Sequence, residues 1–169
     1  MVSVAKEGRI DPMPQSDHDR SDAREIEKRQ LAKFRFWYTP SSCDYTRHPE
    51  NSYFARLAAA RLDEAKRQYR GGLVLDLCCG AGHQAFALAE SVERIVGVDF
   101  SPEMVQAARA AAARHGHANL SFCVANARQI PLPSESIDLV YSFSSLYLIP
   151  AVEEVIREVA RVLKPGGVA

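Results

Sequence analysis

The sequence has no excess of charge of either sign, because its 169 residues hold 21 Lys and Arg against 21 Asp and Glu. That balance does not indicate a surface for nucleic acid or for an anionic membrane. No apolar run approaches the roughly 20 residues that cross a bilayer, and the start Met-Val-Ser-Val-Ala-Lys-Glu lacks the apolar centre of a signal peptide. We therefore expect a cytoplasmic protein with neither nucleic-acid nor membrane partners.

Cysteine is also sparse, with four in the chain. Cys78 and Cys79 are adjacent, whereas Cys43 and Cys123 stand alone, so no Cys-x-x-Cys pair indicates zinc or a disulfide framework. Buried free thiols are the expected state, and no metal site is predicted.

The chain divides into a tail, a helical segment and one α/β domain. Residues 1–20 carry prolines, a glycine and short polar residues, which are typical of a disordered tail. Residues 21–70 are predicted to form an N-terminal helical cap segment, with helices over 21–38 and 52–69. Residues 71–169 form the remaining domain, and the chain is long enough for one hydrophobic core.

The stretch LVLDLCCGAGHQAFA at residues 73–87 organises that domain. Its first five residues predict a strand buried on both faces, Gly80 and Gly82 a tight turn, and residues 83–91 a helix. A glycine turn before a helix N-terminus binds ligands through backbone N–H groups. Asp76 interrupts the apolar run, and a buried carboxylate is costly without a partner. We therefore predict a donor or a cation beside it.

Further apolar runs predict three more strands and two more helices in alternation. The expected strands span 94–99, 120–124 and 137–143, and the expected helices span 101–115 and 151–163. Strands that alternate with helices indicate an α/β fold with parallel strands and right-handed crossovers.

The second of these strands ends in Asp99, 19 positions after Gly80. This spacing matches the acidic residue, about 20 positions on, that binds ribose hydroxyls in nucleotide-binding units. The motifs DLCCGAG at 76–82 and GVDFSPEM at 97–104 together resemble class I S-adenosylmethionine-dependent methyltransferases of the small-molecule type. The usual first motif is DLGCGTG, and the Cys-Cys variant found here resembles that of the quinone-ring methylases.

The resemblance covers about residues 73–169 and implies a Rossmann-like doubly wound parallel sheet. Relatives order their strands 3-2-1-4-5-7-6, and this sequence ends at residues 166–169, where their fifth strand would begin. We therefore expect strands one to four only, in the order 3-2-1-4, preceded by two N-terminal helices. The domain would be incomplete at its C-terminus, with the fourth strand as an unpaired edge.

The resemblance also implies the cofactor, S-adenosyl-L-methionine, and roles for the residues around it. Asp76 would lie near the cofactor's ammonium group, and Asp99 would accept hydrogen bonds from both ribose hydroxyls. Phe100 and Met104 would pack on the adenine, although their spacing of four fits plain core equally well. The implied cofactor-binding residues are Asp76, Cys78, Gly80, Gly82, Asp99, Phe100, Met104, Asn126, Ala127 and Ser142.

The remaining roles lie after the third and fourth strands. Asn126 would bind the adenine amino group, the Ala127 backbone would meet the ring edge, and Ser142 would face the sulfonium and the acceptor. The catalytic residue is left unassigned. Tyr45 and His48, in a loop that relatives fold over the cofactor, are the candidates for a general base.

The implied reaction is methyl transfer to a small molecule by in-line displacement, which requires alignment of donor and acceptor and exclusion of water. The segment SFSSLY at 142–147 stands where methylases of nucleic-acid bases carry Asn-Pro-Pro-Tyr, so a base amino group is not indicated. The aromatic segment 34–53 is expected to select the acceptor, whose identity and methylated atom are not predicted.

Two alternatives stay open. The glycine turn also fits Gly-x-Gly-x-x-Ala, the fingerprint of an NAD-dependent oxidoreductase, although Asp76 would repel a pyrophosphate. The other alternative is a non-catalytic cofactor-binding or interaction fragment. Oligomeric state is not predicted.

Overall fold

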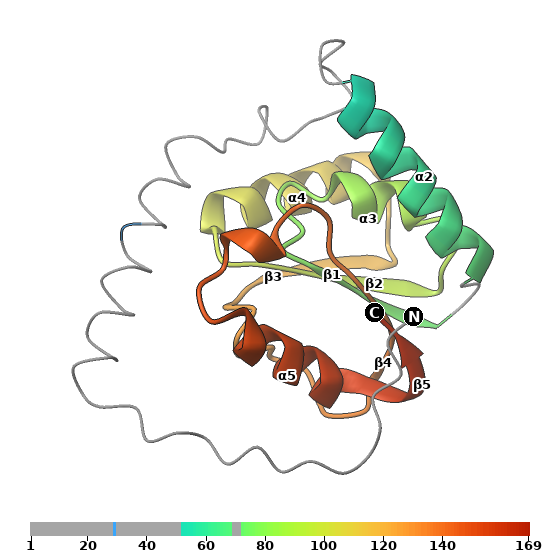
Figure 1. The fold of residues 1–169 in the computed structure, drawn as a ribbon. Helices are drawn as coiled ribbons and strands as arrows, with labels where there is room; N and C mark the ends of the chain where they lie inside the picture. Colours follow the sequence, from blue (N-terminus) through green and yellow to red (C-terminus); the bar gives the residue numbers. More distant parts are fainter. Residues whose placement is uncertain (1–28, 30–51, 69–71) are drawn as a thin grey trace, which may run out of the picture.

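The computed structural model describes residue 29 and residues 52–68 and 72–169 (Figure 1). The expected tail at 1–20, almost all of the expected helix at 21–38, and the general-base candidates Tyr45 and His48 lie outside the described residues. The described elements in chain order are α2 (Ser52–Gln68), β1 (Leu73–Leu77), α3 (His83–Leu88), β2 (Arg94–Asp99), α4 (Pro102–His115), β3 (Leu120–Val124), β4 (Ile137–Tyr141), η2 (Leu146–Leu148), α5 (Val152–Val162) and β5 (Leu163–Val168).

The strands form one parallel sheet in the order β3-β2-β1-β4-β5. This confirms the Rossmann-like parallel sheet and the expected order 3-2-1-4. The order of the strands reverses between β1 and β4, and in such sheets ligands bind in the crevice at the carboxyl ends of the strands on either side of that point. The fold therefore places the candidate site at the ends of β1, β2 and β4.

The fifth strand corrects the expected strand count. We expected four strands with β4 as an edge, but β5 pairs in parallel with β4, which therefore lies between β1 and β5. The sequence Lys-Pro-Gly-Gly had indicated only the end of a helix. Pro165 falls where the register shifts between the pairs Ile137–Leu163 and Leu139–Val168. A bulge tolerates proline, which has no N–H to donate, so the strand forms around it.

Helices cover both faces of the sheet: α2, α3 and α4 lie on one face and α5 on the other (Figure 1). Successive residues of β1 serve the two layers, since Val74 packs with α3 and α4 while Leu75 packs with α5. Burial on both faces explains the nearly continuous apolar run of this strand. Each such side chain contributes about 1.5–3 kcal/mol when fully buried, and Asp76 is the exception within the run.

Local signals fix α4, which follows the second acidic motif. The Ser101 hydroxyl accepts the backbone N–H of Met104 at 3.3 Å, Pro102 occupies the first turn, and Gly116 ends the helix at φ 70°. These are the capping residues that the sequence predicts. The cap holds the connection from β2 to α4, and Asp99 lies on that connection.

A close approach in β2 gives a test of the packing. A Cβ built on Gly97 would lie 2.4 Å from Phe122 Cδ1 and 3.0 Å from Cys79 Sγ. We expect Gly97→Ala to lower the free energy of unfolding by about 1–3 kcal/mol, measured by urea unfolding, because the packed ring must shift.

The matched control is Phe122→Leu, alone and combined with Gly97→Ala. The smaller side chain makes room for the new methyl group, so the two losses should add to more than the loss of the double variant. Strictly additive losses would show that Gly97 is not needed for this contact.

Candidate active site at the carboxyl ends of the strands

The loop from Cys78 to Gly82 joins β1 to α3 and carries three left-handed residues, Cys78 at φ 61°, Gly80 at φ 53° and Gly82 at φ 85°. Backbone bonds close it, since Cys79 N–H donates to the Val98 carbonyl at 3.0 Å and Gly82 N–H to the Cys79 carbonyl at 2.9 Å. A Cβ built on Gly80 would have no heavy atom within 4 Å among its described neighbours. The loop therefore leaves open space at its tip.

Asp99 ties this loop to the end of β2. Its Oδ2 accepts the Gly80 N–H and its Oδ1 accepts the Ser101 N–H, each at 2.9 Å. The side chain is 3% exposed, and burial raises the pKa of Asp99 while the bonds from Ser101 and Gly80 lower it. The spacing of 19 residues found Asp99, but the bond to the glycine loop was not foreseen.

Asp76 is the second buried carboxylate and is 2% exposed. It accepts the backbone N–H of Ala85, yet no group among the described residues donates to its Oδ2. Burial first, and then the charge of Asp99, raises the pKa of Asp76 from 3.8 to about 7. The sequence predicted a donor or a cation here. The Ala85 N–H is such a donor, and Oδ2 is left to bind another.

The two thiols of the loop lie in surroundings that disfavour the thiolate form. Burial, followed by the charges of Asp99 and Asp76, raises the pKa of Cys78 to about 12. The pKa of Cys79 is also raised, mainly by burial. Both therefore stay protonated near neutral pH. Within residues 52–68 and 72–169, no cluster of three or more His, Cys, Asp or Glu side chains is arranged to hold a metal ion.

Phe100 and Met104 differ in exposure. The ring of Phe100 is 37% exposed just beyond Asp99, whereas Met104 is 1% exposed. Of the two readings that the sequence left open, the core reading fits Met104, and Phe100 has an accessible ring for a flat ligand.

Asn126 and Ala127 begin the loop after β3. The Asn126 Oδ1 accepts the Arg128 N–H at 2.9 Å, and the Asn126 carbonyl accepts the Gln129 N–H at 2.8 Å. These bonds form a tight turn that fixes the direction of the Asn126 side chain. Ala127 is buried and packs, together with Ile130, in the apolar layer between the sheet and α5.

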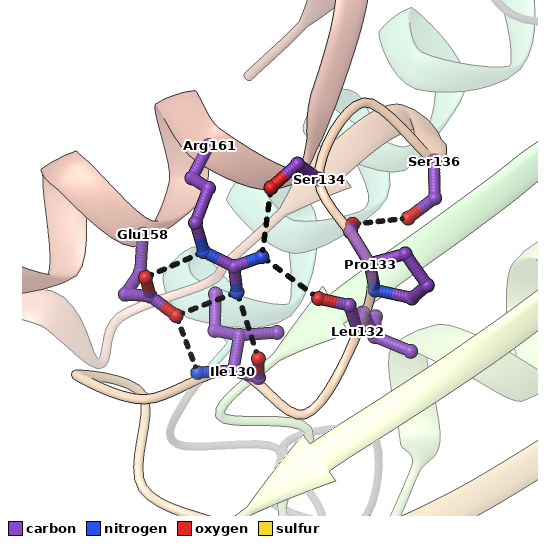
Figure 2. A network of polar contacts seen from close by, with 7 residues as sticks. All are labelled: Ile130, Leu132, Pro133, Ser134, Ser136, Glu158 and Arg161. Atoms are coloured by element: carbon purple, nitrogen blue, oxygen red, sulfur yellow. Dashed lines mark hydrogen bonds and ion pairs between the residues drawn. The ribbon is translucent and has the colours of Figure 1, made fainter.

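Two side chains of α5, Glu158 and Arg161, hold the same loop (Figure 2). The Arg161 guanidinium donates to the carbonyls of Ile130 and Leu132, each at 2.9 Å, and to Glu158 at 2.7 and 2.8 Å. Glu158 Oε2 in turn accepts the Ile130 N–H at 2.8 Å. The hydrogen bond from Arg161 is the first cause of the lowered pKa of Glu158. The loop that carries Asn126 is thus fixed by charge-assisted bonds.

The end of β4 contributes two polar atoms to the site. In the part of the chain that the structure describes, no hydrogen-bond partner exists for the buried Ser142 Oγ or for the buried Tyr141 hydroxyl. The sequence named Ser142 but missed Tyr141. The sequence alone shows part of what was needed, because the two-residue period of a strand places Tyr141 on the same face as Leu139. It does not show that Asp76 is the neighbour of Tyr141 across the sheet, which is known only from the pairing of β1 with β4.

The family model described as "Methyltransferase domain" matches residues 74–167. The chain belongs to this methyltransferase family. Demethylmenaquinone methyltransferase of Lactococcus lactis is 39% identical over 97 residues, which are 56% of this chain and 38% of that protein. Demethylmenaquinone methyltransferase of Geobacillus kaustophilus is 34% identical over 131 residues, 75% of this chain and 56% of that protein.

Solved structures agree with the sequence relatives. The crystal structure of the YcgJ protein from Bacillus subtilis matches with a TM-score of 0.62 at 34% identity, covering 65% of this chain and 47% of that one. Membership of this methyltransferase family supports the cofactor that the sequence indicates, S-adenosyl-L-methionine. This chain spans 38% and 56% of the two curated relatives named above. No helix among the described residues has the length and apolar character of a membrane span.

The raised pKa of Asp76 predicts a pH dependence of cofactor binding. Because the folded pKa of about 7 exceeds the ordinary 3.8, this carboxyl group makes the unliganded protein less stable as pH rises between these values. An ammonium group bound beside Asp76 would favour the charged form of this carboxyl group, so that binding would release a proton. Affinity for S-adenosylhomocysteine, measured by calorimetry, should rise from about pH 5.5 to about pH 8 and then level off. Asp76→Asn should remove this rise, and an unchanged profile would exclude Asp76 as its source.

The bonds of Arg161 to the loop predict a difference between two neighbouring cations. Arg161→Met should lower the free energy of unfolding by about 1–2 kcal/mol, because two loop carbonyls lose a charged donor. Lys164→Met is the matched control, since it removes only the exposed ion pair of Lys164 with Asp138 and should cost about 0–1 kcal/mol. Both are measured by urea unfolding, and equal losses would argue against a clamp on the loop.

Proposed function

We propose that the protein transfers a methyl group from S-adenosyl-L-methionine to a small-molecule acceptor. The main support for this proposal is the buried Asp76 Oδ2, which lies beside an open glycine loop and has no donor among the described residues. A cationic group at this place would end the cost of the unpaired carboxylate. The ammonium group of the cofactor is such a cation, so the residues present fit it.

The other roles extend from Asp76 along the ends of the strands. The loop at Gly80 and Gly82 would accept the methionine chain at close range, with Cys78 as part of its wall. Asp99 would accept the ribose hydroxyls, because each carboxylate oxygen can accept a second hydrogen bond beside those from Gly80 and Ser101. This set of residues stays a proposal.

The adenine would lie between the loop after β3 and the ring of Phe100. Asn126 would bind the amino group and the Ala127 backbone the ring edge, while Met104 would support Phe100 from the core. Ser142 would face the reacting centre. Bound S-adenosyl-L-methionine supplies a methyl group on a sulfonium, and the chain's own contribution is to align the acceptor and exclude water.

The acceptor is inferred at the level of its class. Two of the relatives are named as demethylmenaquinone methyltransferases, so a hydroxylated aromatic ring is the first acceptor to test. Exclusion of nucleic acid and a cytoplasmic location stay predictions from the sequence.

An NAD-dependent oxidoreductase is disfavoured by the buried carboxylate of Asp76 at the glycine loop. A pyrophosphate in the glycine loop would lie against Asp76, whose negative charge would repel it. Calorimetry with S-adenosylhomocysteine and with NAD separates the two functions. We expect binding of the first and none of the second, and the reverse result would overturn the proposal.

Asp99 provides the mutational test. Asp99→Ala should weaken S-adenosylhomocysteine binding by about 10- to 100-fold, which corresponds to about 1–3 kcal/mol for a lost charged acceptor. Asp138→Ala is the control, because Asp138 also accepts a backbone N–H, that of Leu73 at 2.8 Å, but lies at the opposite ends of the strands. Asp138→Ala should lower stability and leave the affinity unchanged. Equal loss of affinity in both variants would remove Asp99 from the ribose site.

A further inference from the structure

Tyr141 lies on the strand next to the buried carboxylate of Asp76. Tyr141 and Asp76 are register partners on the adjacent strands β4 and β1. The preceding pair on the same face, Val74 and Leu139, packs together in the layer beneath α3 and α4. Because side chains two positions apart in a strand share a face, Asp76 and Tyr141 also point to one side.

Both side chains end in an atom that lacks a hydrogen-bond partner. Asp76 Oδ2 and the Tyr141 hydroxyl are each fully buried, and none of the described residues bonds to either. Buried polar atoms of this kind are rare in folded proteins, and each one requires a partner or a functional reason. Two of them on neighbouring strands, at the point where the strand order reverses, indicate a shared ligand.

The carboxylate of Asp76 favours a ligand that carries a positive charge. Burial raises the pKa of Tyr141 to about 12, with a further rise from Asp76 and an opposing contribution from Arg61 of α2. The hydroxyl therefore stays neutral and offers its oxygen as an acceptor. A neutral acceptor oxygen and a carboxylate oxygen on neighbouring strands can together bind a cation with several N–H donors, such as a primary ammonium group.

We propose that Tyr141 is a further cofactor-binding residue, whose hydroxyl oxygen accepts an N–H of the cofactor's ammonium group together with Asp76 Oδ2. This inference rests on the proposed function. It deepens that function by giving the amino-acid end of the cofactor two side-chain ligands from two strands. The ammonium group has three N–H donors, so one contact to each oxygen leaves a third for the backbone or water.

The experiment compares three ligands that differ only at that end. S-adenosylhomocysteine carries the ammonium and the carboxylate, 5′-S-(3-aminopropyl)-5′-thioadenosine carries the ammonium alone, and 5′-methylthioadenosine carries neither. Tyr141→Phe should weaken the first two by about 3- to 10-fold and leave the third unchanged, as measured by calorimetry. The matched control Tyr147→Phe changes a tyrosine that is 76% exposed and should alter none of the three.

Stability separates binding from a structural role. Removing a buried hydroxyl that has no partner should leave the melting temperature of the unliganded protein unchanged or raise it. In the double variant with Asp76→Asn, the losses in affinity should not add, because both oxygens hold the same group.

The outcomes distinguish failure of the role of Tyr141 from failure of the proposed methyltransferase function. Failure of the wild-type protein to bind any of the three ligands would overturn the proposed function. With wild-type binding intact, three results overturn the role of Tyr141 alone: an unchanged affinity in Tyr141→Phe, an equal loss for all three ligands, or a loss confined to S-adenosylhomocysteine, which would indicate a carboxylate contact instead.

Discussion

The two hydrogen bonds of the Asp99 carboxylate are the constraint on which the site depends. One oxygen holds the N–H of Gly80 at the tip of the glycine loop, and the other holds the N–H of Ser101, which caps α4. A single buried side chain therefore fixes the loop after β1 relative to the end of β2 and the start of α4. Because both bonds are made within the protein, they restrict the shape of the loop, and such preorganisation lowers the cost of binding.

This arrangement brings a second carboxylate close to the first, and that proximity has a cost. Asp76 and Asp99 are both buried, and desolvation together with their mutual repulsion favours the protonated form of Asp76. Asp99 is compensated by its N–H donors, whereas Asp76 is compensated only in part, by Ala85. A ligand that brings a positive charge to Asp76 therefore stabilises the fold as well as filling the site.

How much of this could be read from the sequence depends on whether each feature is local. Asp76 and Asp99 belong to short motifs, and the spacing of these motifs is enough to predict a ligand site. The N-terminal cap of α4 is predicted by the three consecutive residues 101–103. Tyr141 could not be found in this way, because its importance comes from pairing with Asp76, 65 positions earlier in the chain. The strand after α5 was missed for another reason. Proline and glycine usually indicate the end of a helix or strand, and only the register shift against β4 shows that Pro165 lies in a bulge of a strand.

The polar atoms at the carboxyl ends of the strands fall into two groups with different roles. Those of Asp99 and Asn126 are bonded within the protein, so they define the shape of the site before any ligand arrives. The buried Asp76 Oδ2, Tyr141 hydroxyl and Ser142 Oγ have no hydrogen-bond partner among the described residues, and a buried polar atom without a partner carries a desolvation cost. Binding removes that cost only if the ligand supplies donors at those places. The unpaired oxygens therefore make the site selective. A ligand of the same shape that lacks a cationic amino group would fill the site but leave these oxygens without donors, so the desolvation cost would remain.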